Sequence, residues 1–256
     1  MQSLNLFLLN VRRALSRISG KQLFAPIYAG ELKGYKFLVD TDNNYFNSSY
    51  EKDSFGYVLN ELKQNPGAVI YDMGANIGYF SLLCAASPGS KAMVYAFEPI
   101  PSNMNLLCRH LLMNKVENII PVNLAVSDHF GLIDFSADNS SVSYTYKQSS
   151  QYYGNRAINI KVGIIDLDML TGQLGFAKPD ILKIDVEGAE YDVLKGAVET
   201  IRKYRPKILL STHEPHVPGI EQHCLDFIKE MDYNYTQTNN ASGRMDGLND
   251  YWCTPK

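Results

Sequence analysis

The sequence lacks several features that would place it in common functional classes. Its 256 residues carry a net charge of −3, whereas proteins that bind nucleic acids usually meet the phosphate backbone with an excess of lysine and arginine. We therefore expect no nucleic-acid partner. No apolar run is long enough to span a bilayer, and there is no internal repeat or low-complexity tract. These absences favour one large globular domain with a short N-terminal extension.

Cysteine is scarce, and its spacing is not that of a metal site. The four cysteines, Cys84, Cys108, Cys224 and Cys253, form no C-x-x-C pair. Cys84 and Cys108 fall in apolar helical patterns, so we expect buried, reduced thiols rather than zinc ligands or disulfides. A cytoplasmic location fits this usage best.

Acidic residues are missing from the N-terminal segment. Arginines interrupt an apolar series that runs from Leu4 to Ile18, and no acid precedes Glu31. A cationic amphipathic helix of this kind is typical of a segment lying on a membrane, or of a transit peptide. We favour a helix that packs its apolar face on the domain. Peripheral membrane contact through residues 1–20 is the alternative.

Strand and helix patterns alternate through most of the chain. Strands rich in valine and isoleucine are predicted at 68–72, 92–97, 119–126, 181–185 and 207–212. Helices are predicted at 53–63, 79–86, 101–114, 191–203 and 220–231. This order predicts an α/β fold with a mostly parallel sheet covered by helices on both faces.

The two ends of the chain and one internal stretch depart from that alternation. Short strand-like pieces within 21–45 predict a hairpin, so we divide the chain into an amphipathic-helix and hairpin extension, 1–50, and a domain, 51–256. Segments near the C-terminus could add a final antiparallel pair. Between Gly131 and Leu170 we expect an insertion of loop and antiparallel strand.

A glycine-rich turn follows the first strand of the domain, in Asp72-Met73-Gly74-Ala75-Asn76-Ile77-Gly78. Such a turn lets the backbone approach a nucleotide-like ligand at the carboxyl end of the sheet. Asn76 replaces the middle glycine of the dinucleotide motif Gly-x-Gly-x-x-Gly, which disfavours an NAD(P)-dependent oxidoreductase. Asp72 suits a cofactor with a cationic amino group and no phosphate, which describes S-adenosylmethionine.

Glu98 follows the second strand, about 20 residues beyond Gly78, where a Rossmann-like fold places an acid against the ribose hydroxyls. Pro99 shapes the turn that comes next. At the end of the third strand, Leu124 and Ala125 could pack on an adenine ring, although core packing explains Leu124 nearly as well.

Acids gather again at the end of the fourth strand, in Leu182-Lys183-Ile184-Asp185-Val186-Glu187-Gly188-Ala189-Glu190. Asp185 and Glu187 are two residues apart, so an extended backbone would point both to one side. Charges at the edge of an apolar sheet are costly to bury without partners, which favours a functional role. His213 and Glu214 end the fifth strand, and either could take a proton from a substrate hydroxyl. A structural role for His213 is equally open.

Taken in order, these motifs resemble the FkbM-type family of S-adenosylmethionine-dependent methyltransferases over roughly residues 50–240. The resemblance implies a Rossmann-like class I methyltransferase fold, with a seven-stranded sheet and one antiparallel strand. It implies O-methylation of a hydroxyl on a sugar, polysaccharide or secondary metabolite. The cofactor-binding residues that we expect are Asp72, Gly74, Ala75, Asn76, Gly78, Glu98, Pro99, Leu124, Ala125 and Asp185.

The same resemblance places Asp185 and Glu187 at the methyl-transfer site. Similar proteins often end the fifth strand with Glu followed by His, whereas here the order is His213-Glu214, so the identity of the base stays open. A divalent metal held by the clustered carboxylates is possible but not favoured, because structural and ribose-binding roles explain most of the acids. We rank a non-catalytic partner subunit below an enzyme, because none of the motifs has lost its characteristic residues.

The acceptor is not identified by the sequence. Tyrosines, serines and asparagines are frequent in 140–159, and this segment could bind a small-molecule or glycan acceptor. It could equally close over the cofactor as a lid.

Overall fold

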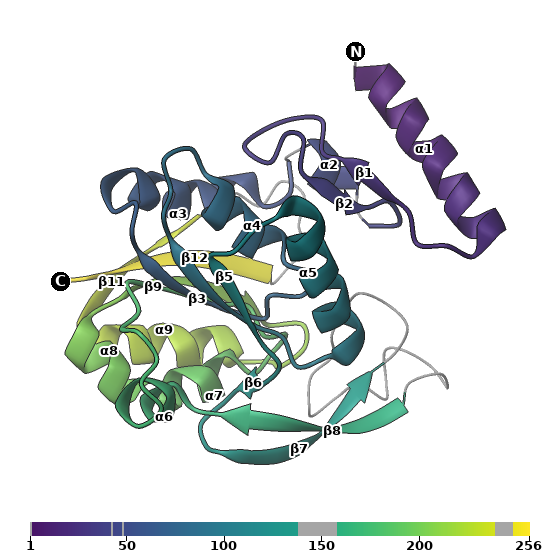
Figure 1. Ribbon diagram of the computed structural model, residues 1–256. Coiled ribbons are helices and arrows are strands. Elements are labelled where there is room, and N and C mark those ends of the chain that lie inside the picture. The colour runs from purple at the N-terminus through teal and green to yellow at the C-terminus, as the bar shows by residue number, and fades with distance from the viewer. Residues whose placement is uncertain (1, 42, 48, 138–157, 239–247) are drawn as a thin grey trace.

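The computed structural model describes residues 2–41, 43–47, 49–137, 158–238 and 248–256, and Figure 1 shows a central sheet with helices on both sides. The strands of this sheet are β3 (Val69–Met73), β4 (Met93–Phe97), β5 (Ile119–Val122), β9 (Ile181–Ile184), β10 (Lys207–His213), β11 (Tyr233–Gln237) and β12 (Leu248–Pro255). Their order is β11-β12-β10-β9-β3-β4-β5. Strand β12 runs opposite to the other six described strands of this sheet. The predicted fold class is confirmed.

Helices cover the two faces of the sheet in two groups (Figure 1). One face carries α3 (Lys52–Gln64), α4 (Tyr79–Ala86) and α5 (Pro101–Asn114). The other carries α6 (Leu167–Gly172), α7 (Glu190–Lys195), α8 (Val198–Tyr204) and α9 (Ile220–Glu230). Side chains alternate along each strand, so Ile70 packs in one core and Tyr71 in the other. Both faces being buried explains why these strands are continuously apolar.

Two predicted elements are interrupted in the structure. The third strand ends at Val122, and Ala125–Val126 form a separate strand, β6, in another sheet. The predicted helix 191–203 is divided into α7 and α8 around Gly196. A Cβ atom at Gly196 would lie 2.1 Å from the backbone oxygen of Ser127, so the chain needs glycine where these segments meet.

The insertion forms a small sheet with the order β6-β8-β7. In it, β7 (Gly131–Ala137) pairs antiparallel with β8 (Ile158–Ile165), which confirms the antiparallel strands expected after Gly131. The connection between β7 and β8, where we expected an acceptor-binding segment or lid, lies outside the described residues.

The N-terminal segment forms α1 (Gln2–Ser19), the antiparallel pair β1 (Phe24–Pro26) and β2 (Lys36–Leu38), and α2 (Asn43–Asn47). The predicted hairpin is confirmed. It packs on α5, where the rings of Phe37 and His110 stack with their centroids 3.9 Å apart. His110 also accepts a hydrogen bond from the Leu38 backbone N–H through Nε2. The extension and the domain therefore share one hydrophobic core.

Helix α1 lies at the outside of the molecule, beside the hairpin (Figure 1). Leu9 is buried against the domain, but most of the other large apolar side chains of α1 are exposed, so our expectation that its apolar face packs on the domain is wrong. No helix in the described part of the chain is long and apolar enough to cross a membrane.

Candidate active site

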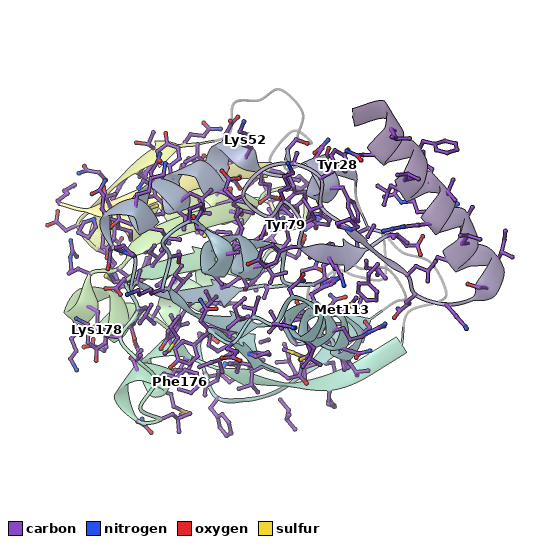
Figure 2. The ribbon with its side chains drawn as sticks, turned by 45° about the horizontal axis from the view of Figure 1, so that its top comes forward. Tyr28, Lys52, Tyr79, Met113, Phe176 and Lys178 are labelled. Carbon is purple, nitrogen blue, oxygen red and sulfur yellow. The ribbon has the colours of Figure 1, made fainter. Side chains whose placement is uncertain are left out.

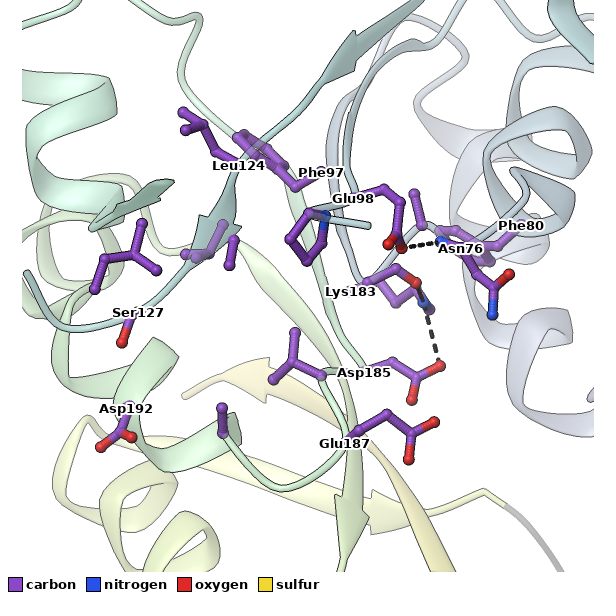
Figure 3. A pocket seen from close by; sticks show the side chains of 18 of the residues that line it. Asn76, Phe80, Phe97, Glu98, Leu124, Ser127, Lys183, Asp185, Glu187 and Asp192 are labelled. Atoms are coloured by element: carbon purple, nitrogen blue, oxygen red, sulfur yellow. Dashed lines mark hydrogen bonds and ion pairs between the residues drawn. The ribbon is translucent and has the colours of Figure 1, made fainter. Parts of the chain in front are cut away.

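A cavity of about 350 Å³ lies at the carboxyl ends of β3, β4 and β9 (Figure 3). Pockets of this size hold small-molecule ligands. The predicted residues that line it are Gly74, Ala75, Asn76, Glu98, Pro99, Leu124, Ala125, Asp185 and Glu187. The structure therefore brings together motifs that are more than a hundred residues apart. The predicted residues that lie outside this lining are Asp72, Gly78, His213 and Glu214.

The glycine turn is shaped by close backbone packing. Gly74 has a φ of +82°, and a Cβ atom there would lie 1.9 Å from the backbone oxygen of Asp185. Only glycine therefore allows the end of β3 to pass so close to the end of β9. Asn76 follows with a φ of 51°, and its backbone N–H donates to Oε2 of Glu98 at 2.9 Å.

Glu98 is held against the turn by backbone amides. Besides the Asn76 contact, the Ile100 N–H donates to Oε1 at 2.8 Å, and the carboxylate is buried. Burial raises the pKa of Glu98 to about 7, while the amide hydrogen bonds oppose this rise. The residue is thus fixed in position at the cavity and changes its charge near neutral pH.

Leu124 and Ala125, which we expected to contact an adenine ring, also line the cavity. Asn123 precedes them in the chain but is not part of the lining. Its side-chain amide donates to the backbone oxygens of Glu98 and Pro99, at 2.8 and 3.2 Å, and so fixes the turn that carries Glu98.

Lys183 lines the cavity, and our reading of the sequence did not assign it to the site. Its ammonium lies 3.2 Å from Asp185 (Figure 3). It also lies 3.1 Å from Asp72 and 3.0 Å from the backbone oxygen of Gly74. Burial alone would lower the pKa of Lys183, but the charges of Asp72 and Asp185 outweigh it and raise that pKa above its ordinary value. The signal was present, since a lysine in a strand as apolar as 181–184 needs a buried partner.

Asp72 lies behind the cavity rather than in its lining. The carboxylate is fully buried, accepts a hydrogen bond from Ser81 at 2.5 Å and pairs with Lys183. These contacts connect β3 to α4 and to β9. Asp72 is therefore placed to position Lys183 rather than to contact a ligand itself.

Asp185, Glu187, Glu190 and His213 form an acidic cluster at one side of the cavity. Nδ1 of His213 lies 2.7 Å from Oε1 of Glu190, which is fully buried. Nε2 of the same ring lies 3.5 Å from Asp185 and 3.5 Å from Glu187. Asp185, Glu187 and His213 each offer one atom within 4.8 Å of the others, so they could hold a metal ion.

The charge of His213 follows from these neighbours. Burial lowers the pKa of this imidazole, but its hydrogen bond to Glu190 and the charges of the other carboxylates outweigh burial and raise the pKa to about 10. These neighbours therefore favour the imidazolium form of His213. Glu214 faces elsewhere, because its two oxygens accept the backbone N–H groups of Gly219 and Glu221 at the start of α9.

An aromatic group from the N-terminal segment completes the cavity. Tyr45 and Tyr50 line it, and their ring centroids lie 4.5 Å apart. Tyr45 also packs against Tyr79 of α4, with 4.6 Å between centroids. The sequence did not reveal this role, because nothing in a local pattern shows that residues before the first strand of the domain return to its ligand edge.

Comparison with known proteins identifies the family of this chain. The sequence model of the methyltransferase FkbM domain family matches residues 72–235. The chain is 30% identical over 152 residues to the hexuronic acid methyltransferase AglP of Haloferax volcanii, covering 59% of this chain and 58% of AglP. It is 31% identical over 157 residues to the 2-O-methyltransferase NoeI of Sinorhizobium fredii, covering 56% and 63% of the two chains. The chain thus spans about three fifths of these relatives.

A solved structure supports the fold. The FkbM methyltransferase of Methylobacillus flagellatus KT superposes with a TM-score of 0.53 at 18% identity, covering 73% of this chain and 44% of that one. The family match spans both the glycine turn and the acidic cluster, which the structure places at one cavity. This protein is a member of the FkbM methyltransferase family.

Proposed function

We propose that this protein is an S-adenosylmethionine-dependent O-methyltransferase that acts on a hydroxyl of a sugar or secondary metabolite. One observation carries the proposal: the glycine turn, Glu98 and the acidic cluster converge on a single cavity. The names of AglP and NoeI describe methylation of a hexuronic acid and of a 2-hydroxyl, which supports the acceptor class.

The residues around the cavity fit this cofactor in charge and shape. Glu98, Asp185 and Glu187 line it beside one buried cation, Lys183, so its polar side favours a ligand with positive charge. S-adenosylmethionine carries a sulfonium and an ammonium group, and when bound it supplies a methyl group that is already activated for transfer. Glu98 would hold the ribose hydroxyls, and Leu124 and Ala125 would contact the adenine ring.

Asp185 and Glu187 are the residues that we propose to accept the proton of the acceptor hydroxyl. Both line the cavity and are partly exposed, and the imidazolium of His213 contacts each of them. A carboxylate within reach of a hydroxyl can take its proton as the new bond forms. His213 would fix the direction of the two carboxylates, and Tyr45 and Tyr50 would exclude water and orient the acceptor.

We propose further that the reaction needs no divalent metal. Asp185 and Glu187 each lie 3.5 Å from Nε2 of His213, and the same ring contacts Glu190 through Nδ1, so contacts within the protein account for these acids without an ion. Turnover should therefore persist in excess chelator. Loss of turnover in chelator, with recovery on adding magnesium, would contradict this part of the proposal.

A transfer assay tests the proposed function directly. The protein is incubated with methyl-labelled S-adenosylmethionine and a panel of uronic acids, deoxysugars, oligosaccharides and polyketide alcohols. We expect label in at least one hydroxyl compound. In D185N or E187Q, kcat at saturating cofactor should fall by about 100-fold or more. E199Q, which changes an exposed carboxylate, is the matched control. If the cofactor binds but no compound is labelled, the protein is a partner subunit instead.

A further inference from the structure

The outer side of α1 is an apolar surface that no described part of the chain covers. Its large side chains are between 40% and 83% exposed, at Leu4, Phe7, Leu8, Val11, Leu15 and Ile18. Their spacing of three and four residues places all of them on one side of the helix. Figure 2 shows side chains of this helix pointing away from the body of the protein. We call this set of residues the α1 stripe. Soluble proteins rarely leave such a surface without a partner.

The opposite side of α1 is fixed to the protein body. Leu9 is buried in the core, and the Arg13 guanidinium donates to the backbone oxygens of Val39 and Thr41 at 2.5 and 2.6 Å. Ser16 donates to a carboxylate oxygen of Asp40 at 2.7 Å. Turning the helix to bury the α1 stripe would break these contacts. The stripe therefore faces outward in the folded protein.

The charges around the α1 stripe identify what it would bind. Arg12 and Arg17 are exposed on the same helix, Lys21 follows, and the first acidic residue is Glu31. Two copies of this chain joined through their stripes would bring arginines together without acids to pair with them. An anionic lipid surface provides a partner for both kinds of side chain. Its acyl chains can contact the stripe, and its negative headgroups can pair with the arginines.

We propose that α1 lies in the plane of an anionic membrane surface, with the α1 stripe in the acyl boundary and Arg12 and Arg17 among the headgroups. This inference is independent of the proposed reaction, because none of the stripe residues lines the cavity. The helix is attached to the same N-terminal segment that supplies Tyr45 and Tyr50 to the cavity. Membrane binding would therefore hold the catalytic domain at the lipid surface.

Vesicle co-sedimentation of the full chain tests the proposal. One set of vesicles is pure phosphatidylcholine, and the other is equal parts phosphatidylcholine and phosphatidylglycerol. We expect binding to the mixed vesicles, weaker binding to the neutral ones, and loss of binding as salt is raised. The double variant F7Q/I18Q should bind the mixed vesicles roughly tenfold more weakly, because two exposed apolar side chains no longer enter the acyl region.

The matched control is L112Q/L174Q, which replaces two exposed leucines far from α1 in the sequence and should bind as the wild type does. Circular dichroism of both variants confirms that they remain folded. The proposal is overturned if the wild type does not bind mixed vesicles, or if F7Q/I18Q binds them equally well. It is also overturned if the protein dimerises through the stripe, seen as a dimer in light scattering that F7Q/I18Q converts to a monomer.

Discussion

Nδ1 of His213 lies 2.7 Å from Oε1 of Glu190, a carboxylate with no exposed surface. The other ring nitrogen lies 3.5 Å from both Asp185 and Glu187, so the contact with Glu190 orients the His213 ring against the two carboxylates of the cavity. This contact makes Glu190 a positioning residue for the proposed proton acceptors.

The variant E190Q tests that role. Without the Glu190 charge, the pKa of His213 should fall from about 10 toward its ordinary value near 6.5. We expect kcat to fall and its pH profile to change above pH 7, where His213 would lose its proton. NMR titration of the His213 ring measures the pKa directly. An unchanged titration in folded E190Q protein would show that the pair does not set this charge.

Lys183 links the interior of the sheet to the cavity, and its removal should be costly. In K183M, the buried carboxylate of Asp72 loses its cation, so the free energy of unfolding should drop by about 3–5 kcal/mol. The double variant D72N/K183M should recover part of this loss, because it removes the unpaired charge. Urea denaturation gives the values.

A surface pair serves as the control for K183M. Lys195 contacts Asp128 and Asp192 but is 40% exposed in its side chain, so K195M should cost no more than about 1 kcal/mol. Equal losses in K183M and K195M would mean that burial of the Lys183 pair does not matter for stability.

Glu98 should make cofactor binding depend on pH. Burial raises its pKa to about 7, so at lower pH the side chain is protonated and can accept fewer hydrogen bonds from ribose hydroxyls. Affinity for S-adenosylhomocysteine should therefore decrease as the pH falls below 7. E98Q should bind with roughly 2 kcal/mol less free energy and without this pH dependence. E117Q, at an exposed glutamate, should behave as wild type. The same pH profile in E98Q and wild type would contradict a ribose contact.

His110 should make the fold less stable in acid. The buried ring binds the Ile77 oxygen through Nδ1 and the Leu38 N–H through Nε2, and burial lowers its pKa from 6.5 to about 4. Between these pH values the unfolded chain binds a proton that the native protein does not, so stability falls as the pH falls through that range. The contribution is about 3 kcal/mol. In denaturation at several pH values, the free energy of unfolding should decrease less in H110Q than in the wild type as the pH falls. If it decreases equally in both proteins, His110 does not cause the loss of stability in acid.

The sequence was sufficient for those parts of the site that depend on local spacing. Gly74, Asn76 and Glu98 follow successive strands, and parallel strands bring their ends to one edge, so their convergence could be predicted. The charge of His213 could not, because it depends on Glu190 and on the depth at which both are buried. Tyr45 was missed for a related reason. Its place in the cavity depends on how the hairpin packs against α5.

The surface that the α1 stripe contacts could not be predicted from the sequence. An apolar series at helical spacing indicates that one side of a helix is apolar, but not which surface that side contacts. Our preference for core packing followed the usual case. The structure reverses it, because Arg13 and Ser16 hold the other side of the helix to the protein.

Calorimetric titration with S-adenosylhomocysteine is the most direct test of a cavity built for S-adenosylmethionine. We predict saturable binding of one molecule per chain and no heat from NADH under the same conditions. If the folded protein gives no heat of binding with S-adenosylhomocysteine, or if it binds NADH instead, the cavity is not an S-adenosylmethionine site.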